Sequence, residues 1–280
     1  MVIAPRSLVD FQRRFGDEAS CRDALREVRW ETGYRCPACG SSKTGWLASR
    51  GLLQCHVCGR QISDTLLTPL HKSHLPLATW FLATWLVATT PGLSSVALAR
   101  QLGLGQKTAW RLLDRTRHAM SSALASPLMG VVEVDEAFFG RKEHQSTVEV
   151  LAEAHRNGRV RMGVVEGQTK TILTTFIAER VEPGSTIRTD GWKGYNGLES
   201  AGFAHERLVH PSGWVEGGER STPYADEAIS AAKRWILSTY NKPPAPERLD
   251  DYLAEFCFRR EFRWPEHAFV ALLRALATPR

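Results

Sequence analysis

Residues 131–140 read VVEVDEAFFG, and this stretch decides the class of fold. Its β-branched and aromatic residues predict a strand, in which alternate side chains point to opposite faces of a sheet. Glu133 and Asp135 therefore share one face of the sheet, and Val132 and Val134 share the other. A carboxylate inside such an apolar run costs free energy unless it lies at the end of the strand, is paired with a cation or binds a metal. Asp135 is therefore a candidate functional residue, with an ion pair to an arginine as the plain alternative.

The residues that follow alternate between strand and helix patterns. Asn157-Gly158 is typical of a hairpin turn and joins two expected strands, 148–154 and 159–166. Further along, we expect a helix at 171–180, a strand at 186–189, a helix at 192–200, a strand at 206–209, a Gly-rich loop at 210–221 and a helix at 223–240. This order predicts a mixed sheet with helices, which is an α/β fold.

The chain upstream of this sheet is helical and basic. We expect two short helices within residues 7–30, and helices within 76–125 that break at 91–92 and at 103–105. The apolar stretch 75–88 is shorter than the roughly 20 residues needed to span a bilayer, so we expect a core helix and no membrane contact. Residues 1–130 hold 16 Lys and Arg against 8 Asp and Glu, whereas residues 131–280 hold 20 against 22. This asymmetry favours contact between the first half and a polyanion.

The overall composition is that of a globular protein. Of the 280 residues, 43% are apolar and 24% are charged, which excludes a disordered chain, a collagen-like repeat and a disulfide-dense mini-protein. No charged-then-apolar signal segment opens the chain, so we expect a cytoplasmic protein associated with the nucleoid, in a reducing compartment.

Four of the six cysteines form two C-x2-C pairs separated by fifteen residues: Cys36, Cys39, Cys55 and Cys58. Each pair directs two thiolates at one ion, and two pairs complete a tetrahedral zinc site. Gly40 and Gly59 follow the pairs and give the backbone freedom at the turns. Because a four-thiolate site has no open position, we expect one structural zinc ion per chain. The alternatives are two disulfides or buried free thiols, and Cys21 and Cys257 are expected to be buried filler residues.

Residues 94–113, SSVALARQLGLGQKTAWRLL, predict a helix-turn-helix. The small Ala99 lets two helices approach, Gly103 makes the turn, and the residues from Gln106 open a recognition helix. The alternative is a helical hairpin with a solvated basic face. Beside a zinc ribbon in the basic half of the chain, DNA binding is favoured. The basic residues available for phosphate contacts are Arg100, Lys107, Arg111, Arg115 and Arg117.

Two more acidic positions accompany Asp135. Asp190 ends an expected strand, where ligands collect in open α/β sheets, and Asp226 and Glu227 lie in the first turn of the last long helix. Each of these acids also has a purely structural explanation. Asp190 can cap a helix, and the helix dipole favours acids such as Asp226 and Glu227 in the first turn. Together, such carboxylates can hold two divalent cations about 3.5–4 Å apart, which activate a water or a 3′ hydroxyl for attack on a phosphodiester.

From residue 8 to residue 263 the chain resembles the ISXO-like DDE transposases of bacterial insertion sequences, which place a zinc ribbon ahead of a ribonuclease H-like catalytic domain. The matching stretches occur in one order and include RWETGYRCPACG, CHVCGRQIS, LARQLGLGQKTAWRLL, VEVDEAFFGRK, TDGWKGYNGL, KRWILSTY and LDDYLAEFCFRREFR. The resemblance implies N-terminal helices at 1–33, the zinc ribbon at 34–70, a helix-turn-helix-like segment at 71–128 and the catalytic domain with C-terminal helices at 129–280.

The resemblance also implies the catalytic residues. Asp135 and Asp190 are the first two carboxylates, and counting back from Lys233 puts the third at Asp226, where Glu is the more familiar residue. Glu227, about 100° further around the helix, is the alternative ligand. The implied cofactors of this site are two Mg²⁺ ions, for which Mn²⁺ can substitute.

The implied function is DNA transposition. The protein would bind the terminal inverted repeats of an insertion sequence in double-stranded DNA, hydrolyse the phosphodiester at the transposon end and join the freed 3′ hydroxyl to target DNA, as a homo-oligomer. Lys233 and Arg234 are candidate phosphate contacts. Trp192 and Tyr195 are expected in the aromatic core, with base stacking as the alternative. Two other functions stay open: a DNA-binding regulator with a degenerate catalytic domain, and a nuclease without strand transfer.

Overall fold

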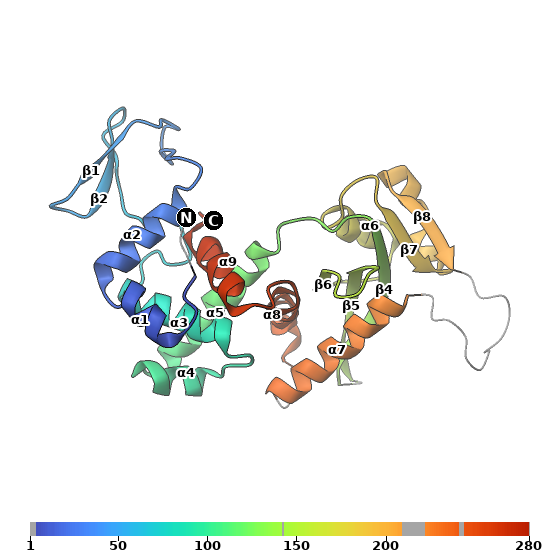
Figure 1. Ribbon diagram of the computed structural model, residues 1–280. Helices are drawn as coiled ribbons and strands as arrows, with labels where there is room; N and C mark the ends of the chain where they lie inside the picture. Colours follow the sequence, from blue (N-terminus) through green and yellow to red (C-terminus); the bar gives the residue numbers. More distant parts are fainter. Residues whose placement is uncertain (1–3, 142, 209–221, 241–243, 280) are drawn as a thin grey trace. The chain divides into compact units, whose positions relative to one another are not determined.

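The computed structural model describes residues 4–141, 143–208, 222–240 and 244–279 (Figure 1). The expected Gly-rich loop at 210–221, with His210, therefore lies outside the described residues. The chain divides into two compact units, Met1–Ala119 with Phe262–Arg280 and Met120–Glu261. We call them unit 1 and unit 2 and describe each by itself.

Unit 2 is built on a five-stranded sheet with the strand order β6-β5-β4-β7-β8. β5 is antiparallel to both of its neighbours, β4 and β6, whereas β7 runs parallel to β4 and β8 runs parallel to β7. The mixed α/β class is thereby confirmed, and the topology agrees with the ribonuclease H-like domain that the resemblance implies. The strands are β4 (Val131–Arg141), β5 (His144–Glu153), β6 (Val160–Val164), β7 (Thr186–Asp190) and β8 (Ala204–Leu208).

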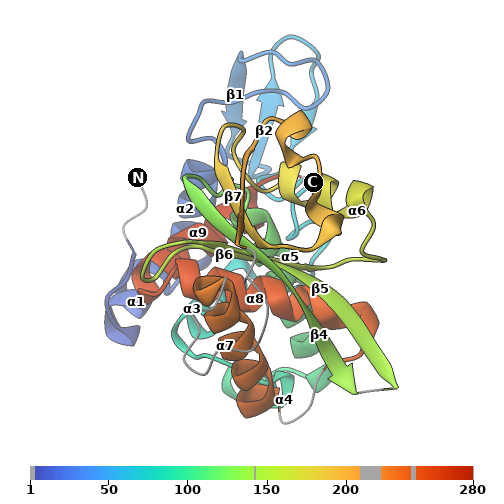
Figure 2. The ribbon, with the colours of Figure 1, turned by 90° about the vertical axis from the view of Figure 1, so that its right-hand side faces the viewer.

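Helices cover both faces of this sheet (Figure 2). On one face, α7 (Pro223–Tyr240) and α8 (Leu249–Glu261), which follows the 3-10 helix η3 (Pro246–Arg248), pack on Val148 and Val150. On the other face, α6 (Lys170–Ala178) and the 3-10 helices η1 (Lys193–Tyr195) and η2 (Leu198–Ala201) pack on Val132 and Val134. The single helix expected at 192–200 is thus two short 3-10 helices.

The reason for that break is local. Gly197 has a φ of 93°, in the left-handed region that glycine tolerates and that a continuous right-handed helix excludes. By contrast, the long helix expected at 223–240 has the bounds Pro223–Tyr240 in the structure.

Unit 1 is mainly helical, with a small three-stranded sheet in the order β1-β2-β3. The uncharged stretch after residue 75 forms α3, which buries residues all around its circumference. Within the described residues, no helix combines the length and the apolarity needed to cross a bilayer. The elements are α1 (Leu8–Phe15), α2 (Glu18–Arg29), β1 (Thr44–Leu47), β2 (Leu52–Cys55), β3 (Gln61–Ile62), α3 (Leu77–Thr89), α4 (Ser95–Leu102), α5 (Gln106–Ala123) and α9 (Pro265–Ala277). The last turn of α5, from Met120, already belongs to unit 2.

The C-terminal helix α9 belongs to unit 1 and not to the sheet domain. Phe269 of α9 is fully buried, and its ring lies 5.8 Å from Phe15 and 5.8 Å from Trp85 between centroids. The expected division placed residues 129–280 in one catalytic domain, whereas the structure groups residues 262–280 with the N-terminal helices because of this aromatic packing.

Candidate functional site

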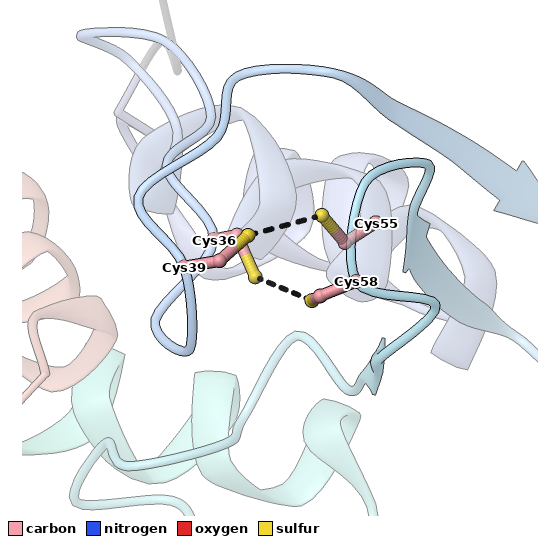
Figure 3. A group of neighbouring side chains, drawn as sticks. All are labelled: Cys36, Cys39, Cys55 and Cys58. Atoms are coloured by element: carbon pink, nitrogen blue, oxygen red, sulfur yellow. Dashed lines mark hydrogen bonds between the residues drawn. The ribbon is translucent and has the colours of Figure 1, made fainter.

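The four paired cysteines meet at one point in unit 1 (Figure 3). Their sulfur atoms all lie within 4.8 Å of one another, with 3.7 Å between Cys36 and Cys58 and 3.6 Å between Cys39 and Cys55. These distances far exceed the roughly 2 Å of a disulfide bond. Four sulfurs at about 2.3 Å from a tetrahedral zinc ion stand roughly 3.8 Å apart. The site therefore fits the four-cysteine zinc ribbon that the spacing predicts.

Two matching turns direct the thiols inward. The N–H of Gly40 donates to the carbonyl of Cys36 at 2.8 Å, and the N–H of Gly59 donates to the carbonyl of Cys55 at 2.9 Å. Gly40 has a φ of 71° and Gly59 a φ of 70°, so both occupy the left-handed region that the sequence required of them. Burial raises the pKa of Cys36, but backbone N–H groups of the turn and the neighbouring thiols outweigh it and lower the value to about 6.

In unit 2, the sheet brings Asp135 and Asp190 onto neighbouring strands. β4 and β7 are parallel, and Glu133 pairs with Arg188 in their register. Asp135 and Asp190 each follow two residues later, so both side chains point to the same face at the carboxyl end of the strand pair. The pairing of two remote acids is thus a direct consequence of the β4–β7 register.

Asp226 and Glu227, adjacent on α7, have different surroundings. Both oxygens of Glu227 accept hydrogen bonds from Arg260 of α8, at 3.1 and 2.6 Å. The charge of Asp226, in contrast, acts on Asp135. Asp226 therefore lies close enough to Asp135 for its charge to raise the pKa of that carboxyl, whereas Glu227 is paired with Arg260 of α8.

The surroundings of Asp135 raise the pKa of its carboxyl to about 6. Burial is the largest cause, and the charges of Asp226 and Asp190 add to it. Two hydrogen bonds act in the opposite direction, one from the Glu136 N–H at 2.8 Å and one from the Thr222 hydroxyl at 3.4 Å. The site thus holds concentrated negative charge that a cation would neutralise.

The chemistry of these donors suits magnesium, because Mg²⁺ prefers carboxylate oxygens. Unlike the cysteine sulfurs, the three carboxylates do not gather within 4.8 Å among the described residues. Two ions about 3.5–4 Å apart, each about 2.1 Å from its ligands, separate the outermost oxygens by as much as about 8 Å. A pair of ions therefore does not require its carboxylate ligands to lie within 4.8 Å of one another.

Asp190 also organises the turn after β7. Its Oδ1 accepts the N–H of Trp192 at 3.0 Å, but Asp190 does not cap the following helix η1, whose N-cap residue is Trp192 and has no side-chain cap hydrogen bond. The Tyr195 side chain is 1% exposed and belongs to the core, as expected, but Trp192 is 38% exposed beside Asp190. Of the two aromatic residues expected in the core, Tyr195 is therefore buried and Trp192 is not.

On the face of the sheet opposite Asp135 lies a pair of acids that sequence reasoning missed, with Glu149 fully buried and Glu136 half-buried. Glu136 and Glu149 are direct partners in the antiparallel register of β4 and β5, and the Tyr195 hydroxyl donates to Glu149 at 3.2 Å. Burial, followed by the charge of Glu136, raises the pKa of Glu149 to about 9. The alternation of β4 could have placed Glu136 on the same face as Val132 and Val134, but its partner depends on the strand register.

The predicted helix-turn-helix has the expected local form. Gly103 ends α4 with a φ of 63°, and α5 begins three residues later. Arg117 is buried and Arg115 donates to the Pro69 carbonyl at 3.1 Å, so the expectation that these two residues face DNA is not met. The other predicted phosphate contacts are exposed: Arg100, Lys107 and Arg111 in this segment, and Lys233 and Arg234 on α7.

Comparisons with known proteins also place a zinc ribbon in the first part of the chain and a transposase domain in the second. Residues 127–261 match the ISXO2-like transposase domain, and residues 16–61 match the transposase zinc-ribbon domain. The chain is 27% identical over 284 residues to an uncharacterized protein in transposable element ISH50 of Halobacterium salinarum, covering 90% of this chain and 94% of that protein.

The similar solved structures include two viral ones. A chain of the simian T-cell lymphotropic virus intasome in complex with PP2A regulatory subunit B56 gamma is 17% identical, with a TM-score of 0.35 over 61% of this chain and 68% of that chain. The HTLV-2 integrase catalytic core domain in complex with magnesium is 14% identical, with a TM-score of 0.32 over 48% of this chain and 85% of that chain.

Proposed function

We propose, from the ISXO2-like transposase domain and the transposase zinc ribbon that this chain carries, that it is the DNA transposase of an insertion sequence. The observation that carries the proposal is the grouping of Asp135 and Asp190, on adjacent parallel strands, with Asp226 on α7. Glu227, the alternative to Asp226 as the third carboxylate, is instead paired with Arg260.

In this proposal, Asp135 and Asp190 would hold the two Mg²⁺ ions, and Asp226 would be a further ligand to them. When bound, these ions activate water or a 3′ hydroxyl and stabilise the leaving oxygen of the phosphodiester. The protein residues bind and orient. The Thr222 hydroxyl and the Glu136 N–H fix the Asp135 carboxylate by hydrogen bonds, and the Trp192 N–H fixes Asp190.

Recognition of the transposon ends belongs to unit 1 in this proposal. The exposed Arg100, Lys107 and Arg111 contact phosphates of the terminal inverted repeats, and the zinc ribbon keeps a structural role. Lys233 and Arg234 contact the DNA that lies in the acidic site. Because two ends must be joined in one event, the working form is a homo-oligomer on double-stranded DNA.

The experiment is cleavage of a linear DNA that carries the inverted repeats of the element, with Mg²⁺ or Mn²⁺. Asp135→Ala and Asp190→Ala should abolish nicking at the transposon end and leave the dissociation constant for that DNA unchanged. If the wild-type protein binds the ends but never nicks them with either metal, the proposal fails, and a DNA-binding regulator with a degenerate catalytic domain takes its place.

A further inference from the structure

Glu133 is a fully buried carboxylate that the proposed chemistry does not use. It lies on β4, two residues before Asp135, and its side chain is 0% exposed. A buried carboxylate is costly unless hydrogen bonds or charges compensate it. Its Oε2 accepts the N–H groups of Tyr224 at 2.6 Å and Ala225 at 3.1 Å, and its Oε1 lies 3.5 Å from Arg188.

These two N–H groups belong to the first turn of α7, where a helix has no internal acceptors. The residue before the helix normally supplies the acceptor. Here that residue is Thr222, and its hydroxyl donates to Asp135 at 3.4 Å instead. Glu133 therefore takes over the capping role from a neighbouring strand, and its charge also favours the positive end of the helix dipole.

The position of this cap ties together the three elements that carry the acidic site. Asp226 directly follows the capped Ala225, and its own N–H donates to the Thr222 carbonyl at 2.9 Å. Asp135 lies two residues beyond Glu133, and Asp190 two residues beyond Arg188, on the same face of their strands. One buried carboxylate thus contacts β7 and α7 from β4, one layer beneath the three acids.

We propose that Glu133 is a positioning residue that holds Asp226 in register with Asp135 and Asp190. This inference rests on the proposed function, since it assigns to Glu133 the geometry of that same site. Without the cap, the first turn of α7 loses its anchor to β4, and Asp226 shifts with it. A displacement of about 1 Å at a reacting centre costs roughly 100-fold in rate.

The test compares three variants of the full chain. Glu133→Ala removes the cap, whereas Glu133→Gln keeps an oxygen that accepts the same two N–H groups. Glu206→Gln is the matched control, because Glu206 also pairs with Arg188, at 3.1 Å, but lies at an exposed edge strand and makes no contact with α7 that the structure shows. Melting temperature, end-DNA affinity and zinc content identify any variant that fails to fold.

For Glu133→Ala we expect the cleavage rate to fall about 100-fold. We expect Mn²⁺ binding, followed by electron paramagnetic resonance without DNA, to weaken by roughly tenfold or more, as for residues that support metal ligands. The amides of Tyr224 and Ala225 should lose hydrogen-exchange protection. Glu133→Gln should stay within about tenfold of wild type, because the acceptor remains, and Glu206→Gln should match wild type.

The outcomes separate this inference from the proposed function. If wild type cleaves and Glu133→Ala equals it in rate, Mn²⁺ affinity and amide protection, the positioning role is wrong and the transposase proposal stands. If Glu133→Ala does not fold, Glu133→Gln decides: a loss as large as that of an Asp226→Asn variant would overturn positioning through the cap. If wild type neither cleaves nor binds Mn²⁺, the proposed function fails, and the inference that rests on it fails too.

Discussion

At the scale of single residues, α7 offers a test of two adjacent carboxylates. Asp226→Asn should reduce end cleavage by at least about 100-fold, because the amide removes a metal-binding charge from the acidic group. Glu227→Gln should stay within about threefold, because this side chain is 51% exposed and serves only an ion pair with Arg260. The measurement is the Mg²⁺-dependent cleavage rate of both variants on one DNA. Equal losses of cleavage rate in the two variants would show that Asp226 is not the carboxylate of α7 that serves the acidic site in preference to Glu227.

Glu149 carries a prediction about pH. The unfolded chain releases this proton near the ordinary value of 4.5, whereas the folded protein holds it up to a pKa of about 9. Between these values the folded state binds more protons than the unfolded state, so the free energy of unfolding of unit 2 falls as pH rises. The groups that face Glu149 are Glu136, Tyr195 and Asp135. The charges of Glu136 and Asp135 raise the pKa of Glu149 further, whereas the hydrogen bond from Tyr195 lowers it.

Glu149→Gln should therefore flatten the fall in stability between pH 5 and pH 9. The neutral amide keeps an acceptor for the Tyr195 hydroxyl and has no proton to lose in this range. Urea unfolding of both proteins at pH 5, 7 and 9 measures the slope. A wild-type slope identical to that of the variant would mean that Glu149 titrates as an ordinary carboxyl.

The sequence identified the acids that stand out against an apolar pattern, but not those that need a partner across the sheet. Asp135 interrupts a run of β-branched residues, which makes it visible without any structure. Glu149 and Tyr195 lie 46 residues apart and meet only through the register of β4 and β5 and the turn after β7. The cap by Glu133 is equally non-local, because the acceptor and the helix are separated by 91 residues.

At the scale of elements, helices and turns with a strong local sequence signal were predicted at the right place in the chain. α7 begins at a proline, which suits the first helical position, and the expected helix at about 223–240 is confirmed. The hairpin at Asn157-Gly158 was also predicted correctly, and Asn157 has the positive φ of 67° that such turns need. The placement of β7 beside β4 was not derivable, since parallel neighbours are joined through a helix and share no local pattern.

The zinc ribbon provides the test at this scale. Cys36→Ser removes one of four thiolates, so we expect loss of the single zinc ion and unfolding of β1 and β2, because structural zinc supplies folding free energy. Zinc content by mass spectrometry and amide exchange of the two strands measure this. Cys21→Ala is the control, because Cys21 is buried outside the quartet and its variant should keep the zinc. A wild-type protein without zinc would refute the assignment.

At the scale of the whole molecule, the chain enters unit 2 and then returns to unit 1. Residues 120–261 form the sheet domain, and α9 afterwards packs on α2 and α3. The expected boundaries missed this return because the aromatic contacts of Phe269 join residues more than 180 positions apart, including Phe11, Phe15, Phe81 and Trp85. Local patterns predict that α9 is a helix but not which core receives it.

The two cores should therefore respond to substitution separately. Phe269→Ala should destabilise unit 1 by about 3–5 kcal/mol, because it leaves a cavity among four aromatic rings, although it lies at the C-terminal end of the chain. Leu253→Ala, at a fully buried position in the core of α7, α8 and the sheet, should cost unit 2 about 2–5 kcal/mol. Amide exchange in urea, followed separately in α3 and in β5, reports the stability of each unit. If Phe269→Ala loosened β5 while leaving α3 protected, α9 would belong to the sheet domain after all, and the chain would divide once, near residue 129, as its sequence pattern suggests.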